Sequence, residues 1–280
     1  MTAPLPVPMA SRWVFLDLDG TLLRPDQTIS APVAEAIGRL RARVPVSIAT
    51  GRERLETIRF AADLELTALQ ICDGGAVIFD MPEGELRWSK PLGKPAVDGV
   101  MKALRSSGSL FFATHPDGAY TNLDGEVAEL PWVTTDPAEA EGLGFTRISA
   151  LDLSERAART LAAELSRLGL NTARAYLPYN GLWAVDFTDP EANKGTAVSR
   201  AAKWAGVALS NCIAIGDSFN DLPMLEACGV SIAMGGAPPE VVAAADFRVP
   251  SVEEDGLALA IDEFVMPLLP RSPGSPGRDG

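Results

Sequence analysis

Residues 14–23 read VFLDLDGTLL, and this stretch decides the fold of the chain. The four residues Trp13–Leu16 are apolar, which predicts a buried strand. Asp17 and Asp19 follow two residues apart, and Gly20 lets the chain turn. Ligands bind at the carboxyl ends of strands in open α/β sheets, so we expect an acidic site at the end of this strand.

The two carboxylates of this stretch create an electrostatic conflict. Without a basic neighbour they repel each other, and one is driven to take up a proton. A bound divalent cation removes the conflict. The alternative is a simple acidic turn that closes a strand, with Asp19 as a turn former before Gly20.

Three further segments place polar residues at strand ends or helix starts. Val44–Ala49 predicts a second strand, followed by Thr50 and Gly51 at the start of a helix. Lys194 opens another helix. Residues 213–221, IAIGDSFND, predict a third buried strand that ends in an acidic loop.

In this order the segments resemble the four motifs of the haloacid dehalogenase superfamily of phosphohydrolases, and they match best its Cof-type, type IIB branch. The resemblance runs from about Trp13 to Val265. It implies an α/β fold: a Rossmann-like core with a parallel sheet and helices on both faces, plus an inserted α/β cap. The chain departs from the branch in two places. Residues 73–75 are Asp-Gly-Gly where Asn-Gly is usual, and residues 235–236 are Gly-Gly where Gly-Asn is usual.

The resemblance also implies a reaction. It is that of a Mg²⁺-dependent phosphatase which hydrolyses a small phosphorylated metabolite, such as a sugar phosphate, through an aspartyl-phosphate intermediate. Asp17 is then the nucleophile and a metal ligand. Asp19 is the general acid and base, and its backbone carbonyl binds the metal. Asp217 is a direct metal ligand. Asp221 is a direct ligand, a more distant metal contact, or the cap of a helix over 222–228.

Binding of the substrate phosphate is assigned to a second set of residues. The hydroxyl of Thr50 and the backbone amides of Gly51 and Arg52 can donate to phosphoryl oxygens. Lys194 can neutralise the transferring phosphoryl group. Asn220 is expected to orient that group or the lysine. The alternatives are a helix N-cap for Thr50 and a solvated side chain for Lys194.

The pattern of elements predicts two domains. We assign residues 11–82 and 188–268 to the core, and 83–187 to a cap inserted between the second and third motifs. Residues 1–10 and 269–280 are predicted to be disordered tails, since the last ten residues are rich in Pro, Gly and Ser. The cap is expected to close over the core as a lid and to recognise the leaving group of the substrate.

Individual elements follow from apolar periodicity and capping residues. The predicted core helices cover 31–43, 53–64 and 196–205, and the later core strands cover 69–72, 76–80, 211–215, 230–234 and 247–249. In the cap we predict strands over 110–114, 146–150, 172–176 and 182–187, with helices over 95–105 and 155–168.

Composition excludes several classes of function. The 280 residues carry a net charge of −13, which disfavours a nucleic-acid partner. No apolar run is long enough to span a membrane, and the first ten residues make a poor signal peptide. The three cysteines, Cys72, Cys212 and Cys228, are typical of reduced core thiols in a cytoplasmic protein. A single histidine, His115, argues against zinc and serine hydrolases.

The cap and the class of reaction leave alternatives open. Arg174 can bind a second anionic group or be solvated, and His115, Asp117 and Asn122 are weaker candidates for specificity. Two other functions compete with the phosphatase: a sugar phosphomutase of the same superfamily, and a non-enzymatic regulator that binds a phospholigand. The chain can be a monomer or a homodimer. Several cap aromatics can face the substrate or pack the cap's own core: Tyr120, Trp132, Tyr176, Tyr179 and Trp183.

Overall fold

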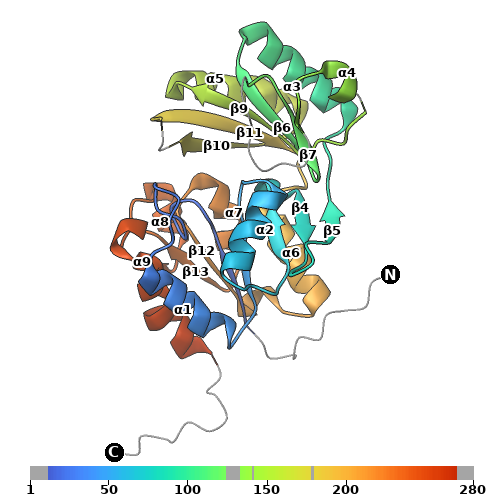
Figure 1. Ribbon diagram of the computed structural model, residues 1–280. Helices are drawn as coiled ribbons and strands as arrows, with labels where there is room; N and C mark the ends of the chain where they lie inside the picture. Colours follow the sequence, from blue (N-terminus) through green and yellow to red (C-terminus); the bar gives the residue numbers. More distant parts are fainter. Residues whose placement is uncertain (1–11, 124–132, 141, 178–179, 270–280) are drawn as a thin grey trace, which may run out of the picture.

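The computed structural model describes residues 12–123, 133–140, 142–177 and 180–269. It has two parts, one above the other in Figure 1. The lower part, here called the core, contains the beginning and the end of the described chain. The upper part, here called the cap, is built from the middle of the chain. The predicted tails, 1–10 and 269–280, lie outside the described residues, except for Leu269, which is buried in the core.

The core contains a five-stranded sheet in which all neighbouring strands are parallel. All four residues of the strand Trp13–Leu16 and all five of the strand Cys212–Gly216 are buried because helices cover both faces. The strands lie in the order β14 (Phe247–Arg248), β13 (Val230–Ala233), β12 (Cys212–Gly216), β1 (Trp13–Leu16) and β2 (Val46–Ile48).

Alternate residues of β1 serve the two faces of this sheet. Val14 and Leu16 join a hydrophobic cluster with α1, α2 and the C-terminal helices. Trp13 and Phe15 join a second cluster with α6, α7 and α8. The helices are α1 (Ala31–Arg41), α2 (Arg54–Asp63), α6 (Lys194–Ala205), α7 (Leu222–Ala227), α8 (Pro239–Ala244), α9 (Gly256–Leu259) and the π-helical η6 (Ala260–Val265).

A small antiparallel sheet extends the core toward the cap. It contains β3 (Gln70–Cys72), β4 (Val77–Phe79) and β5 (Leu86–Ser89), and a bridge from Ala49 to Ile71 joins it to the end of β2. The predicted domain boundary at 82–83 assigns β5 to the cap, whereas the structure pairs it with β4. This strand has no buried residue, so no apolar run marks it in the sequence.

The cap contains a six-stranded sheet in the order β10-β11-β9-β6-β7-β8. All neighbours are antiparallel except β7 and β8. The predicted strands are found, and β7 and β8 are additional. The elements are α3 (Lys94–Ser107), β6 (Leu110–His115), β7 (Gly118–Thr121), β8 (Val133–Thr134), α4 (Pro137–Ala140), β9 (Arg147–Leu153), α5 (Glu155–Leu165), β10 (Asn171–Leu177) and β11 (Leu182–Thr188).

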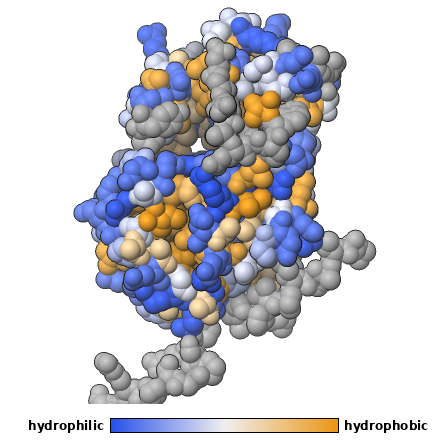
Figure 2. Space-filling view, in the orientation of Figure 1, coloured by the Kyte–Doolittle hydropathy of each residue, from blue (hydrophilic) through white to orange (hydrophobic). Residues whose placement is uncertain are grey.

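The two faces of the cap sheet differ in chemistry. Phe111, Ile148 and Val185 point toward α3 and α5 and join a third hydrophobic cluster. Ser149 and Asp186, directly opposite each other on β9 and β11, belong to the other face, which is turned toward the core. Figure 2 shows mostly hydrophilic residues along the core edge that faces the cap. The junction between the two parts is therefore polar.

Short helical turns complete the described chain. They are η1 (Asp73–Gly75), η2 (Ser166–Leu168), η3 (Leu209–Asn211), η4 (Phe219–Asp221), η5 (Val252–Glu254) and η7 (Met266–Leu268). Among the described residues, no helix is both long and apolar enough to cross a membrane.

Candidate active site

The ends of three neighbouring parallel strands bring the first, second and fourth motifs together. Leu16, the last residue of β1, pairs with Ile48 of β2 on one side and with Ile215 of β12 on the other. The residues that follow these strands, Asp17, Thr50 and Asp217, therefore reach the same edge of the sheet, next to the cap. This is the edge where open α/β sheets bind their ligands.

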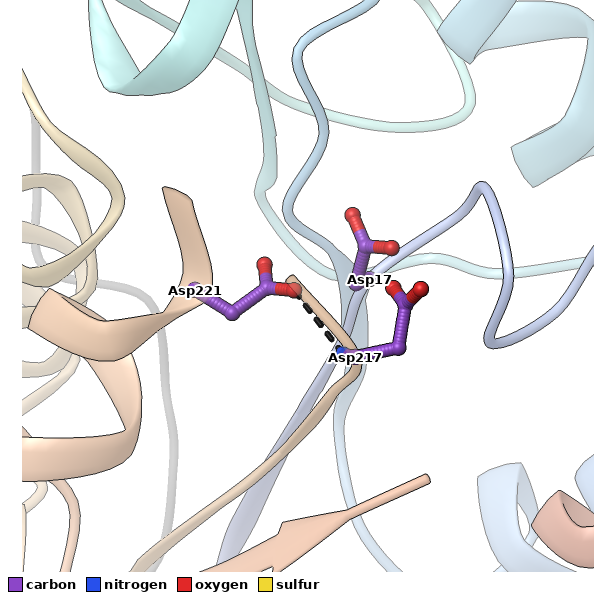
Figure 3. Close-up of side chains that lie close together, drawn as sticks. All are labelled: Asp17, Asp217 and Asp221. Atoms are coloured by element: carbon purple, nitrogen blue, oxygen red, sulfur yellow. Dashed lines mark hydrogen bonds between the residues drawn. The ribbon is translucent and has the colours of Figure 1, made fainter. Parts of the chain in front are cut away.

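Three carboxylates converge at this edge. Asp17, Asp217 and Asp221 each offer an oxygen, and these oxygens lie within 4.8 Å of one another (Figure 3). Asp221 also holds the loop after β12, since its Oδ2 accepts hydrogen bonds from the backbone amides of Asp217 at 3.0 Å and Ser218 at 2.9 Å. Asp19 is not part of this three-carboxylate cluster.

Lys194 is the cation of the cluster. It is the first residue of α6, where Asn193 and Thr196 form a capping box, and its side chain is completely buried. Its Nζ donates to Oδ1 of Asp17 at 2.5 Å and to Oδ1 of Asp221 at 2.6 Å. The alternative of a solvated lysine is therefore wrong. Through Lys194, the third motif contacts Asp17 of the first motif and Asp221 of the fourth.

The pKa values of the cluster reflect its excess of negative charge. Burial, followed by the neighbouring Asp221, raises the pKa of Asp17 to about 7, although Lys194 acts in the opposite direction. Burial, followed by Asp17 and Asp221, also raises the pKa of Asp217. Burial works to lower the pKa of Lys194, but the two carboxylates outweigh it and raise the pKa. One lysine is therefore too little positive charge for three carboxylates, two of which are buried.

The donor set of the cluster fits a magnesium ion. Mg²⁺ takes oxygen ligands from a few carboxylates together with water and phosphate oxygens. Oδ1 of Asp217 is buried and has no hydrogen-bond partner within the described structure, so it is available to a cation. Both oxygens of Asp221 already accept hydrogen bonds from the protein.

Two glycines allow the carboxylates to approach the backbone so closely. Gly20 has a φ of +83°, and a Cβ atom there would lie 2.3 Å from Oδ2 of Asp217. At Gly216 a Cβ would lie 2.6 Å from Cγ of Asp221. A side chain at either position would displace the neighbouring carboxylate. The first and fourth motifs therefore need glycine at these positions for a steric reason.

The second motif lies beside the cluster. Thr50 is fully buried, and its Oγ1 accepts a hydrogen bond of 3.1 Å from the backbone amide of Arg52. The N-cap of α2 is Glu53, which accepts hydrogen bonds from the amides of Leu55 and Glu56, so the alternative of Thr50 as the helix cap is wrong. The Thr50 hydroxyl thus keeps its proton free to donate.

Asp19 and Arg52 form an ion pair at the mouth of the site. Nε and Nη2 of Arg52 donate to the two carboxylate oxygens of Asp19, at 2.9 and 2.5 Å. The Asp19 side chain is 51% exposed. The guanidinium also binds Gln27 and Glu56. Arg52 thus fixes Asp19, a function for its side chain that sequence reasoning did not predict.

Asn220 lies in the turn η4 of the fourth motif, close to Gly51 of the second motif. Its Oδ1 accepts a hydrogen bond of 2.5 Å from the hydroxyl of Ser218. Its Nδ2 lies 3.9 Å from the place where a Cβ on Gly51 would be. The amide nitrogen therefore faces Gly51, so Thr50, Gly51 and Asn220 are brought together as predicted donors.

The aromatic and cationic cap candidates lie elsewhere. Tyr120 and Trp183 pack in the hydrophobic cluster beneath α3 and α5, which favours the packing alternative. Tyr176 is largely exposed and contacts the edge of Trp183. The Arg174 guanidinium lies over the Trp183 ring, and Arg174 pairs with Val185, whose side chain is on the helix-facing side of the sheet. Trp132 and Tyr179 lie outside the described residues.

His115 and Asn122 keep local contacts in the cap, whereas Asp117 also contacts the core. Nδ1 of His115 accepts from the backbone amide of Asp117, and the Asp117 carboxylate pairs with Arg54 of the core at 2.7 Å. Asn122 bonds the backbone amide of Phe111 and the backbone carbonyl of Ser109, both near the start of β6. These bonds account for each side chain structurally.

Sequence reasoning missed a charged cluster at the core–cap junction. Arg147 of β9 lies between Asp73 of the core and Asp186 of β11. The available signal was the Asp at position 73, where the type IIB branch usually has Asn. A carboxylate buried at this position requires a partner, but the sequence does not say which basic residue supplies it.

The family model described as haloacid dehalogenase-like hydrolase matches residues 14–261, which contain all four motifs. The chain belongs to this family. The predicted membership and the prediction of an enzyme are confirmed at this level. The predicted fold class, a parallel core sheet with helices on both faces and an added α/β cap, is confirmed as well.

Individual relatives agree with this assignment. The chain is 26% identical to an HMP-PP phosphatase from Cronobacter sakazakii over 235 residues, which are 81% of this chain and 85% of the relative. A haloacid dehalogenase-like hydrolase from B. subtilis superposes with a TM-score of 0.78 at 23% identity, covering 90% of this chain and 99% of that one. A HAD subclass IIB sugar phosphatase superposes with a TM-score of 0.76 at 20% identity, covering 91% and 99%.

Proposed function

We propose that this hydrolase is a Mg²⁺-dependent phosphatase of small phosphorylated metabolites, such as sugar phosphates, and that it acts through an aspartyl-phosphate intermediate. The observation that carries the proposal is the buried bridge of Lys194 between Asp17 and Asp221 at the strand ends. It places a fixed cation on a carboxylate nucleophile, as phosphoryl transfer requires. The names of the HMP-PP phosphatase and the sugar phosphatase support the same chemistry.

The first step transfers the phosphoryl group to Asp17. Thr50, Gly51 and Asn220 bind phosphoryl oxygens, and Lys194 offsets their negative charge. An oxygen of Asp17 attacks phosphorus in line with the ester oxygen. The P–O bond of the ester breaks as the aspartyl P–O bond forms, and Asp19 gives a proton to the leaving oxygen.

The second step regenerates the enzyme. Asp19, now a carboxylate, removes a proton from a water molecule, and the hydroxide attacks phosphorus. The aspartyl P–O bond breaks, inorganic phosphate leaves, and Asp17 is a carboxylate again. The ion pair with Arg52 fixes the half-exposed Asp19 carboxylate at the mouth of the site, and this proton-free form is the one that the second step uses.

Magnesium would be held by Asp17, Asp217 and the backbone carbonyl of Asp19. The unpartnered Oδ1 of Asp217 supports a direct contact there. For Asp221 the four hydrogen bonds to its oxygens support an orienting role toward Lys194 and the loop after β12. When bound, the ion supplies positive charge that lets the nucleophile and the phosphate approach each other.

We also propose that the block over about 83–187 works as a lid over the core. The two segments that connect it to the core run side by side. Lys90 of the first donates to Glu191 of the second at 2.8 Å, and its Nζ lies 3.8 Å from Asp189. Closure over the polar junction would exclude bulk water from the site while the phosphoryl group is transferred to Asp17.

A cytoplasmic location and the absence of a nucleic-acid partner belong to the same proposal. All three cysteines are free thiols, which is typical of a reducing compartment. The net charge of −13 disfavours binding to a phosphate backbone.

Phosphate release from p-nitrophenyl phosphate by the purified protein tests the proposed function. We expect turnover with Mg²⁺ that is lost on chelation. Binding of phosphate esters without turnover would identify a phospholigand-binding regulator instead. Interconversion of sugar-phosphate isomers without release of phosphate would identify a phosphomutase.

A further inference from the structure

The charged cluster at the junction joins the core to the cap. Arg147 is buried, with its Nε 3.5 Å from Oδ1 of Asp73 in the core and its Nη1 3.4 Å from Oδ1 of Asp186 in the cap. Two hydroxyls fix the carboxylates further. Thr146 donates to Asp73 at 2.6 Å, and Ser149 donates to Asp186 at 2.5 Å. The position of Asp186 over the core is therefore set by two residues of β9, one of which, Arg147, also contacts the core.

The two oxygens of Asp186 have different surroundings. Oδ1 is the one that contacts Ser149 and Arg147. Oδ2 has no hydrogen-bond partner among the described residues, and it lies 4.0 Å from the place where a Cβ on Gly51 would be. Gly51 directly follows Thr50 in the proposed phosphate site. A fixed carboxylate oxygen thus faces that site from the cap and is free to accept a hydrogen bond.

A cavity of about 210 Å³ lies at the same place, between the cap strands β10 and β11 and the turn η4 of the core. It is smaller than the roughly 300–1,000 Å³ typical of pockets for drug-sized ligands, so it suits a small leaving group. Its polar lining includes Asp186 and Asn220, which also flank Gly51, together with Asn171, Arg174, Thr188 and Asn193. The guanidinium of Arg174 itself lies over the Trp183 ring.

We propose that Asp186 determines specificity by accepting, through Oδ2, a hydrogen bond from a hydroxyl on the leaving group of the substrate. This inference rests on the proposed phosphatase function and narrows its substrates to monophosphates of small polyols and sugars. Arg147 is a positioning residue, because it acts on the substrate only through Asp186.

The chemistry of a carboxylate supports this selection. An ionised carboxylate only accepts hydrogen bonds, so it pairs with a hydroxyl and finds nothing to bind on an alkyl chain. A site built to bond a hydroxyl rejects the analogue that lacks it, since its own polar atoms are then left unpaired. A second phosphate group in the cavity would meet the negative charge of Asp186. The site should therefore also discriminate against bisphosphates.

Matched pairs of esters test the proposal. Each monophosphate of a polyol with three to six carbons is compared with the alkyl phosphate of the same chain length, and fructose 6-phosphate with fructose 1,6-bisphosphate. The wild-type enzyme should have a higher kcat/KM for at least one polyol phosphate than for its alkyl partner, and should prefer the monophosphate to the bisphosphate. A wild-type enzyme without a preference for hydroxylated esters would overturn the proposal.

The variant Asp186→Asn identifies the residue. It is nearly isosteric but has no charge, and we expect the polyol-to-alkyl ratio of kcat/KM to fall about 10- to 100-fold, the value of a hydrogen bond to a charged group. The alkyl and p-nitrophenyl esters should change by less than about twofold, and discrimination against the bisphosphate should weaken. The control Asp98→Asn removes the same charge from the exposed surface of α3 and should change none of these ratios.

The outcomes separate this inference from the proposed function. Equal loss on hydroxylated and alkyl esters would overturn the specificity role. If Asp186→Asn does not fold, Asp186→Glu keeps the charge beside Arg147 but moves the oxygen, and an unchanged polyol-to-alkyl ratio in that variant would overturn the role. A wild-type protein that hydrolyses none of the esters, p-nitrophenyl phosphate included, would contradict the phosphatase function itself.

Discussion

Two buried clusters, one in the core and one at the junction with the cap, place a basic residue between two carboxylates. In the core, Lys194 contacts Asp17 and Asp221. At the junction, Arg147 lies between Asp73 and Asp186. The clusters differ in what surrounds them: the core cluster has a third carboxylate, whereas the junction cluster has two hydroxyl donors.

This difference separates the chemistry of the site from its selectivity. The core cluster has excess negative charge and an unpartnered oxygen on Asp217, so it is complete only with another cation. The junction cluster is held by hydroxyls and leaves one oxygen of Asp186 toward the cavity. Lys194 makes contacts of 2.5 and 2.6 Å, while those of Arg147 are 3.4 and 3.5 Å. The short contacts of Lys194 neutralise the charge of the core cluster, whereas the longer contacts of Arg147 position the Asp186 side chain.

Asp17→Asn should break the core cluster completely. Asparagine is nearly isosteric, so the fold should survive, but the nucleophile is lost. Removing such a group typically costs several powers of ten, so we expect less than about 1% of wild-type turnover of p-nitrophenyl phosphate. Circular dichroism checks the fold. The matched control is Asp63→Asn, which changes an exposed carboxylate at the end of α2. Turnover above this level would contradict covalent catalysis by Asp17.

Removal of Mg²⁺ should be nearly as severe. Dialysis against a chelator should abolish turnover, and added Mg²⁺ should restore it, because Lys194 alone does not balance three carboxylates. Asp217→Asn should raise the Mg²⁺ concentration needed for half-maximal rate, while the exposed Asp262→Asn should not. The ion should also raise the melting temperature of wild type, because it binds the folded state. Full activity after exhaustive metal removal would refute this expectation.

Lys194→Ala tests whether the core cluster serves every substrate alike. We expect kcat to fall about 10²- to 10³-fold, as for the loss of one electrostatic contact to the transition state. The factor should be similar for polyol, alkyl and aryl esters, because the lysine acts on the phosphoryl group. Lys203→Ala, exposed in the last turn of the same helix, is the control. If the fall in kcat depended strongly on the leaving group, Lys194 would not act on the phosphoryl group alone, and the proposed difference between the two clusters would be wrong.

Arg147→Met, unlike Lys194→Ala, should affect some esters much more than others. Loss of the cation leaves Asp73 and Asp186 without their common partner, and breaking a buried pair costs about 3 kcal/mol of unfolding free energy. Turnover of polyol phosphates should fall about tenfold through a higher KM, whereas aryl phosphate turnover should persist. Arg159→Met, exposed on α5, controls for the change of residue type. Uniform loss over all esters would mean that Arg147 does not act through Asp186.

Asp73→Asn should have the smallest effect, on the pH dependence of stability. Burial, only partly offset by Arg147 and by the Thr146 hydroxyl, raises the pKa of Asp73 above its ordinary value of 3.8. The folded protein therefore holds this proton more tightly than the unfolded chain, and this contribution to stability is lost as pH rises through the raised pKa.

Asparagine at position 73 keeps an acceptor for Thr146 and tolerates the left-handed φ of +49° there. As pH rises from 3.8, denaturant unfolding should show the free energy of the variant improving relative to wild type. If the unfolding free energies of the variant and the wild type changed with pH in parallel, Asp73 would not titrate in this window.

The sequence predicted most of the regular elements because their signals are local. Buried parallel strands are continuous apolar runs, which is why β1, β2 and β12 were found within one or two residues. Helices α1 and α5 begin at the predicted residues 31 and 155, where the preceding Ser30 and Ser154 accept N-cap hydrogen bonds. The strands β5, β7 and β8 were missed. They are short or exposed at an edge, and neither case leaves a clear pattern of alternation.

By itself, the sequence determined the order of the four motifs and the carboxylates and lysine that the proposed chemistry needs, because these depend on residue type and short spacing. Only the tertiary structure decided what meets across the chain. Arg147 is 74 residues from Asp73 and 39 from Asp186, and Lys194 is 177 from Asp17. Such pairs have no local signature, since strand register and the docking of the cap on the core bring them together. The same register turned Trp183 and Arg174 away from the core and placed Asp186 over the phosphate loop.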